Sequence, residues 1–190
     1  MPISCCMIVK NEDAILSRCL NSIYPFVEEI VIYDTGSTDN TEEIARLYEK
    51  VRFIKGEWEN SFALARNKSI ENAKYDWVLW IDADEFFDPS NASCFKELTE
   101  YGDINDIDAY DFLCQSFVDG KHWALFVNDL KPKLFRNYCR FIGGLHENLS
   151  GYKNKQWANI VYQHHKKKSW QILDDIRYKK ISEIQKENNA

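Results

Sequence analysis

The chain has 190 residues, of which 45% are hydrophobic and 14% aromatic, a composition that predicts a folded globular protein and excludes a disordered one. This length suits one domain with a substantial core. The formal net charge of -6 argues against a general nucleic-acid-binding protein, because such proteins usually present a basic face to the phosphates.

The sequence also bears on where the protein is located. No window approaches the roughly 18 to 20 consecutive apolar residues of a membrane-spanning helix, and the start, MPISCCMIVK, lacks the features of a signal peptide. The six cysteines include no CxxC pair, which favours reduced and mostly buried thiols over disulfides or a zinc site. A cytoplasmic location is therefore expected.

The first hundred residues alternate between apolar runs and amphipathic stretches. Strands joined by single helices predict right-handed crossovers and a parallel sheet. The predicted elements are a strand at 3–9, a helix over Ile15, Leu16, Cys19, Leu20 and Ile23 that Pro25 ends, a strand at 28–34, a helix capped by Asp39 or Asn40 that carries Ile44, Leu47 and Tyr48, a strand at 51–55, a helix at 61–73 and a strand at 76–82.

After residue 90 the pattern indicates strands. Two strand-like runs around Asp119–Gly120 predict a β-hairpin with these two residues as the turn. Further strands are expected at 131–136 and 154–165, separated by a glycine-bearing segment at 141–151. The predicted fold class is therefore α/β, with a Rossmann-like, mixed but mostly parallel sheet flanked by helices.

These elements predict a single domain, in which residues 1–90 form a nucleotide-binding half and residues 91–190 complete the sheet. An amphipathic helix is expected from Ser169 to about Glu187, with a basic run at its start. Its apolar stripe and lysines are compatible with peripheral contact with a membrane surface or with a homo-oligomer. Packing against its own sheet is the favoured alternative.

Three carboxylates, on Asp82, Asp84 and Glu85, directly follow an uninterrupted apolar run at 77–81. Such groups repel one another and lose hydration on burial, so a partner of opposite charge is expected. Asp82 and Asp84 point the same way in an extended chain, and carboxylate oxygens suit Mg²⁺ or Mn²⁺. A solvated acidic strand end is the alternative, but the position after a buried strand favours a metal site.

Polar residues follow other predicted strands as well. Ligands of open parallel sheets bind outside the carboxyl ends of the strands, which places Asn11, Glu12, Asp34 and the 82–84 segment along one edge. The sequence contains neither GxxxxGK[ST] nor GxGxxG, so P-loop and ordinary dinucleotide chemistry lose their main support. A bound diphosphate would therefore depend on the metal and on a few side chains.

Four segments carry a family resemblance: MIVKNE at 7–12, VIYDTGSTDNT at 31–41, ARNKSIENA at 65–73 and WVLWIDADE at 77–85. Together and in this order they resemble family 2 glycosyltransferases, which have the GT-A fold. FIGGLHE at 141–147 resembles an F-x-G-x-x-H-E element of the branch that includes lipopolysaccharide-core glucosyltransferases and sublancin-type peptide glycosyltransferases. The resemblance covers about residues 3–180.

The resemblance implies roles for individual residues. Asp34 would accept a hydrogen bond from the base, most often uracil, with the backbone near Ile8 and Val9 flanking it. Asp84 would ligate the metal directly. The other implied contacts are Glu12 and Asp39 with the nucleotide, Arg66 and Asn67 with the base or the sheet edge, Asp82 and Ala83 with the ribose or a metal-bound water, and His164, or alternatively His165, with the metal.

The resemblance further implies an inverting, metal-dependent transfer from a nucleoside diphosphate sugar, most often a UDP-sugar, to a saccharide, lipid-linked or peptide acceptor. A base must then lie within reach of the acceptor's proton. Glu147 and His146 are the candidates, because Gly143 and Gly144 let the backbone approach a ligand closely. The alternative, in which His146 and Glu147 only tie this loop to the sheet, stays open.

Two other functions are alternatives. A nucleotidyltransferase that makes nucleoside diphosphate sugars usually needs a glycine-rich N-terminal loop, and MIVKNEDAILSR contains no glycine. The second alternative is a non-catalytic relic of a glycosyltransferase, which binds nucleotide or sugar without turnover. The intact pair Asp82 and Asp84 argues against such a loss of activity.

Overall fold

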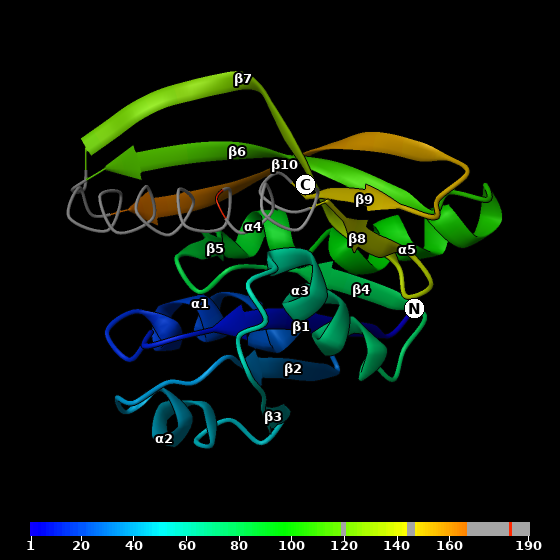
Figure 1. The fold of residues 1–190 in the computed structure, drawn as a ribbon. Coiled ribbons are helices and arrows are strands. Elements are labelled where there is room, and N and C mark those ends of the chain that lie inside the picture. Colours follow the sequence, from blue (N-terminus) through cyan, green and yellow to red (C-terminus); the bar gives the residue numbers. More distant parts are fainter. Residues whose placement is uncertain (119–120, 144–146, 167–182, 184–190) are drawn as a thin grey trace.

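The computed structural model of the chain describes residues 1–118, 121–143, 147–166 and 183 (Figure 1). One eight-stranded sheet has the order β3-β2-β1-β4-β7-β6-β10-β5, and β8 and β9 form a separate two-stranded sheet. The elements are β1 Ile3–Val9, α1 Leu16–Ile23, a 3-10 turn Tyr24–Phe26, β2 Glu29–Asp34, α2 Thr41–Ala45, β3 Val51–Lys55, α3 Phe62–Glu71, β4 Trp77–Trp80, β5 Glu85–Phe87, α4 Pro89–Ala92, α5 Phe95–Ile104, β6 Ala109–Val118, β7 Lys121–Arg136, β8 Arg140–Ile142, β9 Asn148–Ser150 and β10 Lys155–Lys166.

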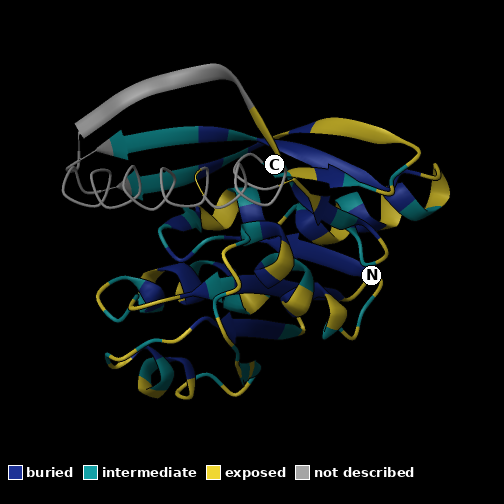
Figure 2. Ribbon diagram, in the orientation of Figure 1, coloured by how far each residue is buried: buried dark blue, intermediate teal, exposed yellow. Residues whose placement is uncertain are grey.

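The first four strands form the parallel half of the sheet. β1 pairs in parallel with both β2 and β4, and β2 pairs in parallel with β3. All four residues of β4 are buried, as expected for a strand covered on both faces (Figure 2). The predicted strands and the mixed α/β fold class are therefore confirmed.

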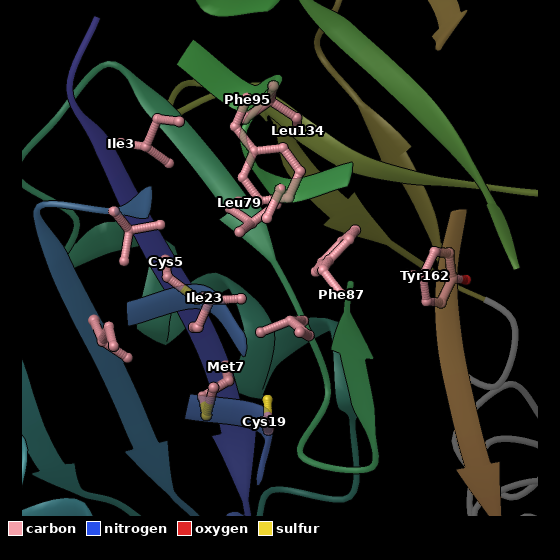
Figure 3. Packing of buried hydrophobic residues seen from close by; sticks show 14 of the residues in the cluster. Ile3, Cys5, Met7, Cys19, Ile23, Leu79, Phe87, Phe95, Leu134 and Tyr162 are labelled. Carbon is pink, nitrogen blue, oxygen red and sulfur yellow. The ribbon is translucent and has the colours of Figure 1, made fainter. Parts of the chain in front are cut away.

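Alternate residues of β1 supply the two faces of this half. Cys5 and Met7 belong to a core cluster with the buried stripe of α1, which includes Cys19 and Ile23 (Figure 3). Cys6 faces the other way, into a cluster that contains Ala63 and Ile70 of α3 and residues of β8 and β9. The strand's apolar run thus packs on helices above and below, which fixes its carboxyl end in place.

The second half extends the sheet with antiparallel strands. β7 pairs antiparallel with both β4 and β6, while β10 pairs in parallel with β6 and antiparallel with β5. The pairing of Val118 with Lys121 fits the predicted hairpin, whose turn residues 119–120 lie outside the described part of the chain. The expected separate strand at 131–136 is wrong, because these residues continue β7.

Proline explains why the strand β7 looks like two strands in the sequence. Pro132 lies inside β7 opposite Asp111, next to a shift of register between Tyr110 and Asp111. Proline has no N–H to donate to the ladder, so strands accommodate it at such irregularities. The apolar pattern breaks there although the strand continues.

The expected helix after Asn40 is shorter than predicted. α2 ends at Ala45, and Leu47 is 80% exposed instead of packed on the core. The chain turns at this point, with the Val51 N–H donating to the Tyr48 carbonyl at 2.9 Å. The elements β5, α4 and α5 have no counterpart among the elements predicted from the sequence.

Three further predictions concern thiols and the chain's end. All six cysteines are free, and five of them are buried, in agreement with the sequence. The helix predicted from residue 169 to 187, with its membrane and oligomer alternatives, lies outside the described residues apart from residue 183. In the described segments, no helix has the length and apolar character to cross a membrane.

Candidate functional site

A groove with a volume of about 560 Å³ opens where the carboxyl ends of β1 and β4 meet strands of the second half of the chain. Both halves of the sheet therefore contribute to it. Its lining comprises Ile8, Val9, Lys10, Glu12 and Thr35, then Trp58, Phe62 and Arg66, then Trp80, Asp82, Ala83, Asp84 and Glu85, and finally Cys114, Lys131, Pro132, Lys133, Phe141, Glu147, Asn148, Tyr162 and His164.

Asp84 and His164 meet in this groove. The His164 Nε2 lies 3.0 Å from the Asp84 Oδ2, and both side chains are about one-fifth exposed, at 22% and 21%. The contact follows from the sheet, because β5 and β10 pair antiparallel with His164 opposite Glu85. The His165 N–H also donates to the Asp84 carbonyl at 2.9 Å, which joins the turn after β4 to β10.

The charge state of His164 is set by these neighbours. Burial acts to lower its pKa, but hydrogen bonds with Asp84 and Cys114 and the nearby carboxylates overcome this and raise the pKa to about 10. The imidazole is therefore protonated at neutral pH and forms an ion pair with Asp84. This cation is one partner of opposite charge for the acidic cluster.

The neighbouring His165 has different surroundings. Its ring stacks on Phe117 with centroids 4.5 Å apart and lies 4.9 Å from the Phe86 ring. Burial, together with the nearby positive charge of Arg18, lowers the pKa of His165. The strand brings His164, and not His165, to the Asp84 carboxylate.

Asp82 is held by a neighbouring cation. The Arg66 Nη2 lies 3.6 Å from the Asp82 Oδ2. The Arg66 guanidinium itself lies over two aromatic rings, 4.8 Å from the Trp80 centroid and 5.1 Å from that of Phe141. Its Nε is buried with no hydrogen-bond partner among the described residues, which leaves a donor available to a ligand.

Glu85 and Lys133 are groove residues whose pairing the sequence did not predict. The Lys133 Nζ lies 2.5 Å from the Glu85 Oε2, and the two side chains are 4% and 5% exposed, in that order. Burial raises the pKa of the Glu85 carboxyl, and the Lys133 ammonium opposes this rise. No short stretch of sequence signals this pair, because only the pairing of distant strands brings the two residues together.

Glu147 lines the groove beside Asn148, at the start of β9. Its Oε1 is buried and has no hydrogen-bond partner in the part of the chain that the structure describes. Burying a carboxylate oxygen without a hydrogen bond is costly, and a ligand that donates a hydrogen bond would satisfy it. His146, the other predicted base, lies outside the described residues.

Three predicted site residues form hydrogen bonds with the surrounding backbone. Asp34 is buried and accepts hydrogen bonds from the Ser37 N–H at 3.1 Å and the Ser37 hydroxyl at 2.5 Å. Asp39 accepts a hydrogen bond from the Thr41 N–H at 3.0 Å. Burial acts to raise the pKa of Asp39, but the hydrogen bonds from Thr41 outweigh this and lower the pKa. Asn67 exchanges two hydrogen bonds of 2.9 Å with the Phe141 backbone, which orders the sheet edge.

The donor set of the groove can be compared with the needs of a metal. Within residues 1–118, 121–143 and 147–166, no three side chains of His, Cys, Asp or Glu converge into a complete metal-binding group. Asp84 and His164 nevertheless offer an oxygen and a nitrogen at one point of the groove. Mg²⁺ and Mn²⁺ are often bound by one or two protein ligands, with phosphate oxygens and water completing the shell, so these residues fit such an ion.

Comparisons with known proteins show which family this chain resembles. The family model described as glycosyl transferase family 2 matches residues 4–124. The SPbeta prophage-derived glycosyltransferase SunS of Bacillus subtilis is 27% identical over 160 residues, which cover 84% of this chain and 37% of SunS. The lipopolysaccharide core biosynthesis glycosyltransferase LpsC of Rhizobium meliloti is 33% identical over 107 residues, covering 54% of this chain and 39% of LpsC.

A solved structure shares the fold. The crystal structure of residues 1–349 of S. aureus TarS, in complex with UDP-GlcNAc, superposes with a TM-score of 0.64 at 19% sequence identity, over 87% of this chain and 59% of that crystallised chain. The chain thus has the fold that its sequence predicted. It spans less than two-fifths of the length of SunS and LpsC, at 37% and 39%.

Proposed function

Since the chain belongs to glycosyl transferase family 2, we propose that it transfers a sugar from a nucleoside diphosphate sugar, most often a UDP-sugar, to a saccharide, lipid-linked or peptide acceptor. The observation that carries this proposal is the contact of 3.0 Å between Asp84 and His164 inside a groove shared by both halves of the sheet. A solvated acidic strand end would not enclose its carboxylates in this way.

The nucleotide would lie against the parallel half of the sheet. Ile8 and Val9 at the end of β1 line the groove, as does Glu12, and Asp34 shapes the neighbouring turn. Arg66 is held against aromatic rings with one buried N–H unpaired, so it can donate to the base or to a phosphate. This wall combines the apolar side chains of Ile8 and Val9 with the charged groups of Glu12 and Arg66.

The diphosphate would lie at the acidic turn. Asp84 and His164 would hold Mg²⁺ or Mn²⁺, and a bound ion neutralises the charge that develops on the departing nucleoside diphosphate. To accept the ion, His164 must lose the proton it shares with Asp84, because a metal-bound imidazole is neutral. Asp82, oriented by Arg66, would contact the ribose or a metal-bound water.

Glu147 would act as the general base. Its unpaired Oε1 can take the proton of the acceptor while the acceptor oxygen, nitrogen or sulfur attacks the anomeric carbon. The bond between that carbon and the diphosphate oxygen breaks in the same displacement, so the configuration inverts. The transition state has oxocarbenium character, as in glycoside hydrolysis.

The test is a donor panel measured by thermal shift and by release of nucleoside diphosphate, with and without Mn²⁺. We expect a UDP-sugar with Mn²⁺ to stabilise the fold, by about 2.7 kcal/mol at a hundred times its dissociation constant. Asp84→Asn should lose the metal-dependent part of both signals. Glu147→Gln should keep donor binding and lose about 10²–10⁴-fold in turnover.

The exposed Asp106 provides the control, because Asp106→Asn makes the same chemical change away from the groove and should leave both signals unchanged. Donor binding without any turnover would favour the non-catalytic relic. Release of pyrophosphate from a sugar phosphate and a nucleoside triphosphate would favour the nucleotidyltransferase. No shift with any nucleotide would overturn the donor assignment.

A further inference from the structure

The turn that carries Asp84 is closed by Glu85. The Glu85 Oε2 accepts a hydrogen bond from the Asp82 N–H at 2.9 Å, and the Glu85 N–H donates to the Asp82 carbonyl at 3.0 Å. These two bonds join the first and last residues of a four-residue segment. Asp84, between them, therefore has its backbone position set by the Glu85 carboxylate.

Lys133 in turn fixes that carboxylate. Its ammonium, 2.5 Å from the same Oε2, reaches the turn from β7 on the other half of the sheet. The ammonium also lies 4.4 Å from the centroid of the Tyr162 ring, two residues before His164 on β10. The pair thus touches both segments that supply the proposed metal ligands.

The free-energy cost of burying the Glu85–Lys133 ion pair indicates a role beyond packing. Buried ion pairs are often no more stable than apolar side chains of similar volume, because two charges have to leave water. Glu85 and Lys133 are both almost fully buried, at 5% and 3% exposure. An apolar pair would fill the same space without closing the turn.

We propose that the Glu85–Lys133 pair is a positioning device for the donor site, which holds the Asp82–Glu85 turn in the conformation that sets Asp84 against His164. The inference rests on the proposed function, because it takes Asp84 and His164 as the groups that hold the metal and its diphosphate. Neither Glu85 nor Lys133 touches the reacting atoms in this role.

The double variant Glu85→Leu/Lys133→Met separates this role from a merely structural one. It removes both charges together, so no buried charge is left unpaired, and the melting temperature should stay near that of the unchanged protein or rise. The turn loses its acceptor for the Asp82 N–H, so the affinity for Mn²⁺ in the presence of UDP should fall about 10- to 100-fold. Calorimetric titration of Mn²⁺ measures this affinity without any turnover.

A second double variant tests the hydrogen bond itself. Glu85→Gln/Lys133→Met also lacks both charges, but the glutamine oxygen can still accept from the Asp82 N–H. We expect it to recover most of the Mn²⁺ affinity that the leucine variant loses. The same leucine and methionine changes at the ion pair of Asp111 and Lys155, which are 2.7 Å apart and outside the groove lining, should leave that affinity unchanged.

The outcomes are distinct for the two proposals. A folded Glu85→Leu/Lys133→Met protein with unchanged Mn²⁺ affinity overturns the positioning role and leaves the proposed function intact. If that variant does not fold, a folded Glu85→Gln/Lys133→Met protein with weakened Mn²⁺ affinity overturns it, because the glutamine keeps the acceptor for the Asp82 N–H. Failure of the unchanged protein to bind Mn²⁺ with UDP overturns both.

Discussion

At the scale of single residues, the adjacent histidines of β10 have different contacts because their side chains face in opposite directions. Adjacent residues of a strand point to opposite faces. His164 consequently meets Asp84, while His165 packs between the rings of Phe86 and Phe117. The doublet of histidines is ambiguous in the sequence, and the register of β10 against β5 resolves which ring contacts the carboxylate.

We expect the two histidines to differ when each is replaced by alanine. His164→Ala should weaken Mn²⁺ binding by at least about tenfold, since even partners of metal ligands are worth that much. His165→Ala should leave Mn²⁺ affinity near its original value and lower only the melting temperature, because its ring is packed between aromatic rings. Titration of Mn²⁺ in the presence of UDP checks both, and equal losses would contradict the distinction.

The residues of the site were predictable to different degrees. Asp82 and Asp84 could be found from a local pattern, because carboxylates that directly follow a buried apolar run stand at the end of a strand, where ligands bind. The role of Lys133 could not be found in this way, since its partner Glu85 lies 48 residues away and only the sheet brings them together. Pairing between distant strands is not encoded in any short stretch of sequence.

At the scale of elements, the parallel strands were easier to predict than the elements that follow them. Apolar runs such as those of β1 and β4 are continuous because both faces are buried. The end of α2 was not predictable in this way, because Leu47 continues the helical spacing of Ile44 although the chain has already turned. The proline in β7 likewise divides the pattern of a continuous strand.

One buried carboxylate ties several elements together. Asp108, just before β6, accepts hydrogen bonds from the Lys153 N–H at 2.6 Å, from the Asn154 N–H at 3.0 Å and from the Tyr138 hydroxyl. Burial opposes ionisation, but these bonds lower the pKa of Asp108. The segment leading into β10 is therefore anchored to the start of β6 by an ionised side chain.

We predict that Asp108→Asn destabilises the protein by about 1–3 kcal/mol at pH 7, because hydrogen bonds to a charged acceptor are lost or weakened. The folded pKa of Asp108 lies below the unfolded value of about 3.9, so the carboxylate contributes its stability above that value. The contribution is lost as the pH falls through the folded pKa. Urea unfolding at pH 7 and near pH 3 should show the difference between the proteins shrinking with acid.

At the scale of the whole molecule, the groove exists only where two halves of the sheet meet. The end of β1 and the turn after β4 come from the parallel half, and Lys133 and His164 come from β7 and β10. The proposed donor site therefore draws on both the half expected at residues 1–90 and the half expected at residues 91–190.

Binding of the donor should therefore slow amide hydrogen exchange in both halves of the sheet. We expect UDP with Mn²⁺ to slow amide hydrogen exchange in the backbone near Ile8 and Val9 and also in β10 near His164, because a ligand in the groove restricts both. Exchange in α5, which contributes no residue to the groove lining, serves as the internal control. Protection confined to the β1 end would argue against a ligand that reaches the Asp84–His164 contact.

The contact between Asp84 and His164 joins residues 80 positions apart in the chain. During synthesis on the ribosome, strands β1 to β9 emerge before His164, so a partial chain contains one of the two proposed metal ligands without the other. Contacts this distant form late, after the chain entropy between them has been overcome. Affinity for Mn²⁺ would accordingly be acquired only by a completed sheet, and unfinished chains would not sequester the ion or its nucleotide.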